Sequence, residues 1–95
     1  MKVWLAPQAE QDLIAAAKFW AKRASAALGN AFLDEIGRAC TLLGENPLSG
    51  HPDRLQTRRL VLRRFPFSVV YRVLANEIQV IAVAHHRRKP GYWAG

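Results

Sequence analysis

The chain has 95 residues, of which 51% are hydrophobic and 22% are charged. This is the composition of a globular domain, and it excludes a disordered or fibrous chain. No apolar run approaches the ~18 residues of a membrane span, and the N-terminus lacks the apolar core of a signal peptide. Cys40 is the only cysteine, which excludes an intrachain disulfide and a cysteine zinc site. We therefore expect one soluble, cytoplasmic domain over residues 1–95.

The positive charge of the chain is confined to its second half. Lys and Arg number 14 against 7 Asp and Glu, a formal net charge of +7. Residues 1–50 carry five basic and five acidic side chains, whereas residues 51–95 carry nine basic ones against Asp53 and Glu77. Such polarity indicates an anionic partner, whether nucleic acid, an acidic protein or a membrane surface. The alternative is a basic domain without such a partner.

The first elements are a short strand and a helix. Residues 2–6 alternate apolar side chains and predict an edge strand or a strand that pairs with a later one. Pro7 fits the first position of a helix, where its missing N–H costs nothing. The apolar stripe of the helix predicted over residues 7–23 consists of Ala9, Leu13, Ala16 and Trp20.

A second helix is predicted over residues 26–43. Ser25 can cap its N-terminus, and Gly44 is expected to end it as a left-handed C-cap. Because only one or two residues around Ala24 join the helices, they should form an antiparallel hairpin.

The remaining chain predicts a loop over residues 45–56 and then three strands. Period-two stretches rich in Val, Ile, Phe and Tyr cover residues 57–63, 67–74 and 77–84. Their short links indicate an antiparallel meander. The predicted fold is therefore α+β: an N-terminal strand, a helical hairpin and a three-stranded meander, with the helices on one face of the sheet.

The apolar pattern predicts which strand residues share a face. With Leu62 opposite Val69 and Val73 opposite Ile78, one face lies beneath the helices and comprises Leu60, Leu62, Phe67, Val69, Tyr71, Val73, Ile78, Val80 and Ala82. The opposite face then pairs Arg59 with Arg72 and Arg63 with Ser68, and it also holds His85, Val61, Val70, Ile81 and Val83. Facing arginines repel each other, so this face, which holds no acidic residue, is predicted to meet solvent, an anion or a partner.

The segment after the last strand, residues 85–93, mixes basic side chains with Tyr92 and Trp93. This mixture suits a phosphate backbone with stacked bases, or an acidic groove on a protein. Alternatively, the two aromatic rings pack back onto the sheet and the charges are solvated. The pair His85–His86 has no carboxylate or cysteine near it in the sequence, so neither a metal nor a cofactor is expected.

Metal-free RNA cleavage would need a base, an acid and cations around the phosphate. His85 or His86 could transfer protons, because imidazole titrates near neutral pH, whereas Tyr92 could assist only weakly. The cations could come from Arg59, Arg72 and Arg87. These groups allow catalysis but do not complete a catalytic set.

The order of these elements resembles the RelE/ParE family of bacterial toxins, over nearly the whole chain. The segments that carry the resemblance are Ala9 with Asp12-Leu13, Asn46–Gly50, Thr57–Leu60, Val69–Val73 and Ala84–Arg88. The resemblance implies the toxin of a type II toxin–antitoxin module. A cognate antitoxin would silence it, and operator DNA would be bound only through the antitoxin complex, with no membrane partner. RelE-like members cut mRNA in the ribosomal A site, whereas ParE-like members are not nucleases and poison DNA gyrase.

Carried over by position, the resemblance implies nuclease roles for Arg59, for Arg87 and for Tyr92 or Trp93. His85 or His86 matches a histidine that some relatives use. However, Val61 and Ser68 stand where RelE-like nucleases carry cations. The absence of these two cations favours a toxin that arrests growth by ParE-like inhibition of gyrase over an mRNA interferase. A plain nucleic-acid-binding module is a third alternative. The residues predicted to bind target or antitoxin are Arg59, Arg63, Arg72, Arg87, Arg88 and Trp93.

Overall fold

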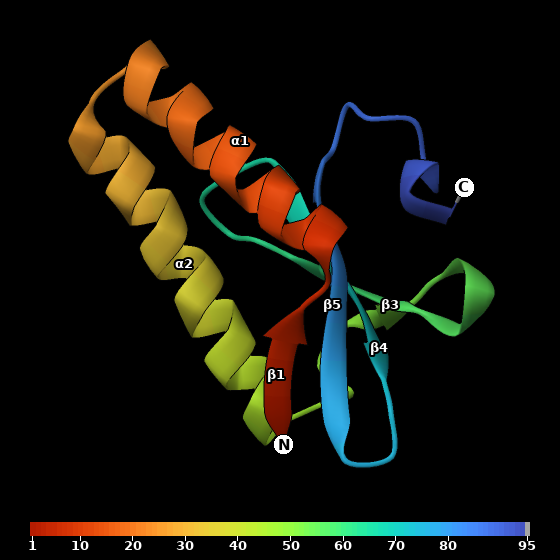
Figure 1. The fold of residues 1–95 in the computed structure, drawn as a ribbon. Coiled ribbons are helices and arrows are strands. Elements are labelled where there is room, and N and C mark those ends of the chain that lie inside the picture. The colour runs from red at the N-terminus through yellow and green to blue at the C-terminus, as the bar shows by residue number, and fades with distance from the viewer. Residues whose placement is uncertain (95) are drawn as a thin grey trace.

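The computed structural model describes residues 1–94 as a helical hairpin packed on a five-stranded sheet (Figure 1). The strands are β1 (Lys2–Leu5), β2 (His51–Pro52), β3 (Arg58–Val61), β4 (Phe67–Val73) and β5 (Glu77–His85). Their order in the sheet is β1-β5-β4-β3-β2. β1 runs parallel to β5 at one edge, and the other pairs are antiparallel. The predicted α+β fold is confirmed, and the N-terminal strand pairs with the last strand of the meander.

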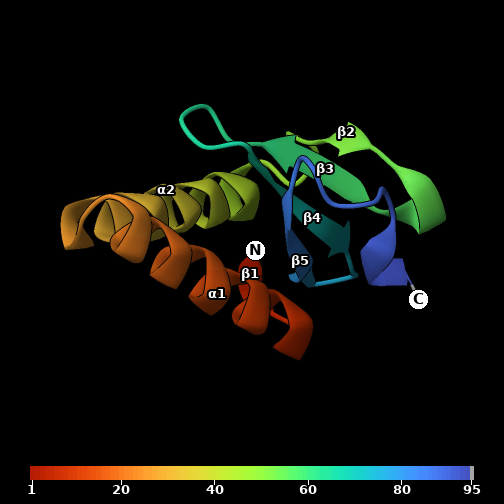
Figure 2. The same cartoon turned by 90° about the horizontal axis from the view of Figure 1, so that it is seen from above.

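The helices are α1 (Pro7–Arg23) and α2 (Ala26–Glu45), joined through two residues. α1 has the predicted bounds, and the side chain of Ser25 caps α2 by accepting a hydrogen bond from the Leu28 N–H at 3.2 Å. Figure 2 shows the hairpin and the C-terminal turn on opposite sides of β5. No helix within residues 1–94 is both long enough and apolar enough to span a membrane.

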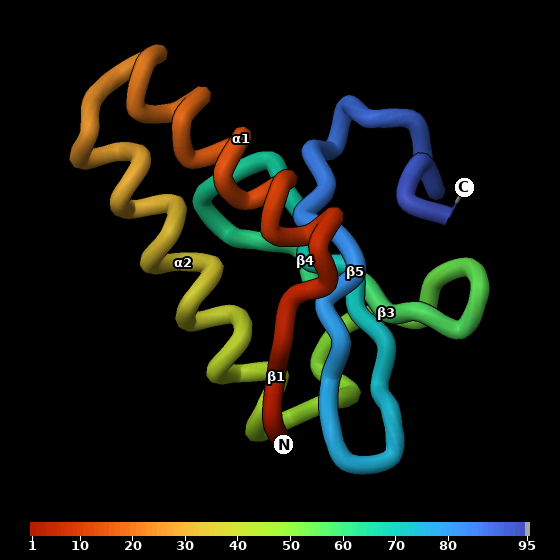
Figure 3. The backbone as a smooth tube through the Cα atoms, in the orientation of Figure 1, coloured from red at the N-terminus to blue at the C-terminus, as the bar shows by residue number. Residues whose placement is uncertain are grey.

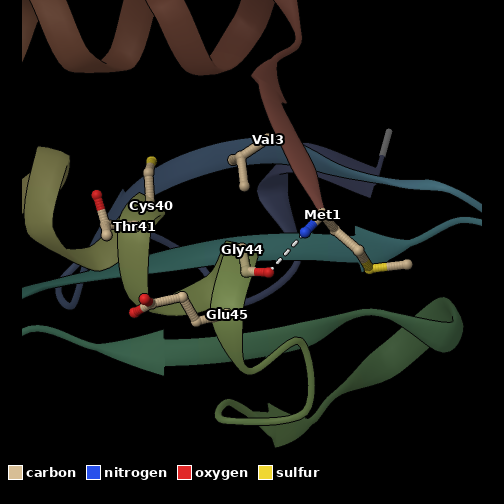
Figure 4. A pocket seen from close by; sticks show the side chains of 6 residues that line it. All are labelled: Met1, Val3, Cys40, Thr41, Gly44 and Glu45. Atoms are coloured by element: carbon tan, nitrogen blue, oxygen red, sulfur yellow. Dashed lines mark hydrogen bonds between the residues drawn. The ribbon is translucent and has the colours of Figure 1, made fainter.

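The prediction that Gly44 ends α2 is wrong, because the helix continues to Glu45 and is capped by Asn46. Gly44 instead allows the N-terminal strand to approach the helix. A Cβ at this position would lie 2.9 Å from the Met1 carbonyl oxygen. The amino group of Met1 donates to the Gly44 carbonyl at 2.7 Å (Figure 4). The glycine is therefore required by tertiary contact and not by a left-handed turn.

The main apolar core lies between the helices and the sheet face beneath them, which we call the helix face. Phe32, Leu43, Tyr71 and Ile78 are fully buried there. The Phe32 ring lies edge-on to the rings of Phe65 and Phe67, with centroids 5.1 and 5.0 Å away. Because the α2 stripe and the alternating strand residues meet at this face, hydrophobic burial holds the two layers together.

The segment between α2 and β3, predicted as a loop, contains β2 and a short 3-10 turn, Arg54–Gln56. The buried Tyr71 anchors its first part. The Tyr71 hydroxyl donates to the Pro47 carbonyl at 2.7 Å and accepts a hydrogen bond from the Gly50 N–H at 2.9 Å. A Cβ at Gly50 would lie 2.8 Å from the Tyr71 hydroxyl, so glycine is needed for this contact.

The register between β3 and β4 differs from the prediction by two residues. Leu60, not Leu62, lies opposite Val69. The predicted register would place Phe65-Pro66 in a two-residue hairpin turn. Both common types of this turn need a positive φ at the first residue, here Phe65, and the type I′ turn also needs one at the second, which proline cannot adopt. The chain instead makes a wider turn over residues 63–66, closed by the Leu62 N–H donating to the Phe67 carbonyl at 2.9 Å. A shift of two residues preserves the faces of the strand but changes every partner.

A β-bulge in β5 also changes the predicted faces. Val73 lies opposite Ile78 and Tyr71 opposite Val80, as predicted, but Val70 lies opposite Ala82 and leaves Ile81 as the extra residue. Residues beyond the bulge therefore exchange faces.

The predicted faces of Ala82, Val83 and His85 are consequently wrong. Val83 joins the main core, and Ala82 lies on the opposite face with Val70 and Ala84, where Tyr92 and Trp93 pack over them. We call this second face the tail face.

Candidate functional site

The arginines of the tail face do not face one another as predicted. Arg59 lies opposite Val70, and Arg72 lies opposite Gln79. The prediction that no acidic residue reaches this face is also wrong, since the Arg59 Nε lies 3.4 Å from the Asp53 carboxylate. An ion pair with the loop before β3, and not an external anion, offsets this charge. The two-residue register shift accounts for the lost pairing of the arginines.

The two histidines lie on different sides of the sheet. The His85 ring lies edge-on to Phe67 with centroids 4.9 Å apart, which places it on the helix face. Burial lowers the pKa of His85, and the charges of Arg87 and His86 lower it further. The His86 Nε2 lies 2.9 Å from the hydroxyl of Ser68, which is buried. The bulge in β5 thus moves His85 from the predicted tail face to the helix face, and of the two alternative proton-transfer residues it is His86 that contacts the tail-face residue Ser68.

The aromatic residues of the C-terminal segment pack back onto the sheet, as the alternative interpretation held. The Arg88 guanidinium lies 3.8 Å from the centroid of the Tyr92 ring. The Tyr92 hydroxyl donates to Oδ2 of Asp12 at 3.0 Å. This carboxylate oxygen also accepts a hydrogen bond from the Val83 N–H at 3.1 Å. Burial, the hydrogen bond to Asp12 and the charge of Asp12 raise the pKa of Tyr92 to about 12.

The structure brings part of the predicted site together. A small hollow of about 40 Å³ is bordered by Arg59, His85, His86, Arg88, Tyr92 and Trp93, together with Ala84, Lys89, Pro90 and Gly91. Arg63, Arg72 and Arg87 do not border it. This volume holds a few water molecules and is too small for a nucleobase. Within residues 1–94, no cluster of three or more His, Cys, Asp or Glu side chains is placed to hold a metal ion.

A larger groove, of about 570 Å³, lies between α2 and the end of β3. Its apolar lining residues are Ala39, Leu42, Leu60, Val61 and Leu62, and its charged lining residues, which we call the rim, are Glu35, Arg38, Arg63 and Arg64. Leu42 is 40% exposed and Val61 is 50% exposed. The Glu35 carboxylate accepts the Arg63 N–H at 2.9 Å and so fixes the rim. Exposed apolar side chains with charged residues beside them are typical of a surface that binds a protein segment.

Of the groove residues, only Arg63 is among the binding residues predicted from the sequence. The spacing of Glu35, Arg38 and Leu42 places them on one side of a helix, but that pattern does not indicate which strand lies beside it. The hollow between β1 and α2 is open and is lined by Met1, Val3, Cys40, Thr41, Gly44 and Glu45 (Figure 4). Burial raises the pKa of the Cys40 thiol, so this side chain is not an activated nucleophile.

The fold and these surfaces define a small α+β protein whose second half is basic. Residues 3–90 match the family described as the ParE toxin of the type II toxin-antitoxin system, parDE. The chain belongs to this family, and the predicted resemblance to RelE/ParE toxins is confirmed.

Known proteins that are similar to this chain include a curated relative and a solved structure. The "Putative toxin Y4kP" of Sinorhizobium fredii is 39% identical over 57 residues, which cover 58% of this chain and 58% of that protein. The match therefore spans less than two thirds of the relative. A structure titled "Chromosomal ParDE TA system from P. aeruginosa" aligns with a TM-score of 0.80 and 25% identity, covering 90% of this chain and 95% of that one.

Proposed function

We propose that this chain is the toxin of a type II toxin–antitoxin module, that a cognate antitoxin silences it, and that it arrests growth by inhibiting DNA gyrase. The match of residues 3–90 to the ParE toxin family carries the proposal. Gyrase as the target follows from the ParE-like pattern of the sequence, in which Val61 and Ser68 replace the cations of the RelE-like nucleases.

The antitoxin is proposed to place an acidic, amphipathic segment in the groove between α2 and β3. The exposed side chains of Leu42 and Val61 offer apolar contact, and Arg38, Arg63 and Arg64 line the rim. Complementary charge speeds capture and fixes the orientation of the bound segment. Arg59 and Arg72, which the sequence analysis offered for this contact, instead bind the loop before β3.

Three observations favour target binding over RNA cleavage. A general acid or base needs a pKa near the working pH, whereas that of Tyr92 is raised to about 12. Arg59 is paired with Asp53. The His85 ring lies on the helix face. Of the proposed proton-transfer groups, this leaves His86 on the tail face, where it contacts Ser68.

Induced expression of the chain alone tests the proposal. We expect growth arrest, DNA breaks with an SOS response, rescue by the neighbouring antitoxin gene, and loss of supercoiling by purified gyrase. Primer extension on cellular mRNA should detect no new 5′ ends. Discrete cuts within translated codons, abolished by Arg87→Ala in stable protein, would instead establish the ribosome-dependent endoribonuclease.

A further inference from the structure

The loop before β3 holds two consecutive residues in a left-handed conformation. Leu55 has φ 56° and ψ 39°, and Gln56 has φ 58°. Side chains with a Cβ rarely adopt this region, and leucine has no short polar group to compensate for it. Such strain persists only where surrounding contacts impose it, and it concentrates at functional sites.

Contacts from the loop itself close it tightly. The Asp53 N–H donates to the Thr57 carbonyl at 2.8 Å, and the Asp53 carboxylate accepts the Arg54 N–H at 2.8 Å. The Thr57 hydroxyl donates to the Arg54 carbonyl at 2.7 Å. These bonds span the base of the loop, so residues between them have little freedom.

Three arginines hold the loop against the sheet and the C-terminal turn. Arg72 Nη2 donates to the Leu55 carbonyl at 3.1 Å, and Arg59 pairs with the Asp53 carboxylate. Arg54 Nη1 lies 3.4 Å from the Pro90 carbonyl. A Cβ at Gly91, whose φ is +76°, would lie 2.7 Å from Arg54 Nη1, so the turn is shaped around this arginine.

These contacts hold the loop so that the apolar side chain of Leu55 is exposed to solvent. Leu55 is 61% exposed and belongs to neither apolar cluster of the described residues. The loop projects at the end of the sheet away from the helical hairpin and beside the C-terminal segment (Figures 1 and 3). The strained conformation therefore gives Leu55 no burial within the chain.

We propose that Leu55 is a preorganised anchor that inserts into an apolar pocket of the target protein, and that carboxylates rim this pocket. Arg54 directly precedes the leucine, and Arg72 donates to the leucine's carbonyl oxygen. The Asp53 carboxylate is shared by Arg54 and Arg59, at 3.9 and 3.4 Å, so cations outnumber acidic groups beside Leu55 and an acidic rim is the complementary chemistry. A rigid loop loses little conformational entropy on binding. The inference rests on the proposed function, because it assigns a contact with the inhibited protein.

The position of Leu55 favours the target over the antitoxin as its partner. Leu55 precedes β3, whereas the groove proposed for the antitoxin lies at the other end of that strand, around Arg63 and Arg64. The loop and the groove are therefore separate surfaces, and a substitution at Leu55 can weaken the contact with the target without weakening the contact with the antitoxin.

Substitutions that keep the loop conformation but remove the side chain test this anchor. Leu55→Gly and Leu55→Asn suit the left-handed region, so the melting temperature should stay the same or rise. Inhibition of purified DNA gyrase should weaken by about 30-fold or more, as for an anchor residue at the centre of an interface. Leu55→Met should keep most of the inhibition. Leu48→Asn is the matched control, because Leu48 is 68% exposed in the neighbouring loop.

The inference is overturned if Leu55→Gly folds, binds the antitoxin and inhibits gyrase like the wild type. It is equally overturned if antitoxin affinity falls by the same factor as inhibition, since Leu55 would then belong to the antitoxin interface. If the wild-type chain arrests growth but does not affect gyrase, gyrase is not the target, and the anchor must be tested on growth instead. The same variants are then compared by the expression level that each needs to arrest growth, which should be higher for Leu55→Gly than for the wild type. A wild-type chain without any toxicity overturns the proposed function, and the anchor with it.

Discussion

The helix face and the tail face of the sheet are covered by different means. On the helix face, α1 and α2 bury an apolar cluster that includes Phe32, Leu43 and Ile78. On the tail face, a short C-terminal segment places Tyr92 and Trp93 over small residues of β4 and β5. Polar contacts hold that segment, among them the Tyr92 hydroxyl on Asp12.

This difference indicates where the protein can change shape at low cost. Removing the helices would expose the main core, so their separation should coincide with global unfolding. The C-terminal segment can detach by breaking a few polar contacts and exposing a small patch, which is typical of the least stable parts of a native structure. The candidate target-binding residues lie in or beside this more weakly held part.

The largest effect should come from emptying the helix face. Phe32 is fully buried between the rings of Phe65 and Phe67, so Phe32→Ala should lower the free energy of unfolding by about 3–5 kcal/mol. Trp93→Ala on the tail face should cost less than half as much, because Trp93 is only partly buried. Chemical denaturation measures both. Equal losses would refute the contrast between the faces.

A smaller loss is expected where the helix face reaches the loop before β2. Tyr71→Phe removes the acceptor of the Gly50 N–H and the donor to the Pro47 carbonyl. Leaving these groups unpaired should cost about 1–3 kcal/mol. Hydrogen exchange should speed at the Gly50 amide. An unchanged free energy of unfolding would mean that water replaces the hydroxyl.

A smaller loss of stability is expected on the tail face, where the hydrogen bond from Tyr92 to Asp12 holds the C-terminal segment. Tyr92→Phe removes one hydrogen bond to the Asp12 carboxylate. Because that carboxylate keeps the Val83 N–H as a donor, the cost should lie at the low end of the range for a charged acceptor, about 1.5 kcal/mol. Amide exchange should accelerate in residues 92–94 while the core amides stay protected. A double-mutant cycle with Asp12→Asn isolates the coupling; additive effects would show that the two side chains do not cooperate.

The last prediction concerns the dependence of stability on pH, which is flat at neutral pH and begins only near the unfolded pKa of tyrosine, about 10. The pKa of Tyr92 is raised to about 12, first by burial and then by Asp12. A raised pKa favours the protonated form in the folded state, so the stability it contributes is complete below the unfolded pKa of about 10 and is lost as pH rises toward 12. Tyrosinate absorbance, compared between wild type and Tyr92→Phe, measures this titration. Ionisation of Tyr92 near pH 10 would refute its burial and its hydrogen bond to Asp12.

The elements that the sequence predicted well are those whose signals are local. The apolar spacing after Pro7 and the cap at Ser25 placed α1 and the start of α2 correctly. The alternation in β4 and β5 predicted the pairing of Val73 with Ile78. These signals depend on the period of the backbone and on the nearest neighbours in the chain. The family was predicted separately, from the resemblance of five short segments and their order to known toxins.

Tertiary structure decided the details of the candidate site. The extra residue Ile81 moved His85 to the helix face. The residues around Ile81 carry no sequence signal that predicts a bulge. Asp12 meets Tyr92 across 80 residues of sequence, and the groove exists only where α2 lies beside β3. Side-chain periodicity specifies what each element buries, but one inserted residue reverses a face, and contacts between distant segments form only once the elements pack.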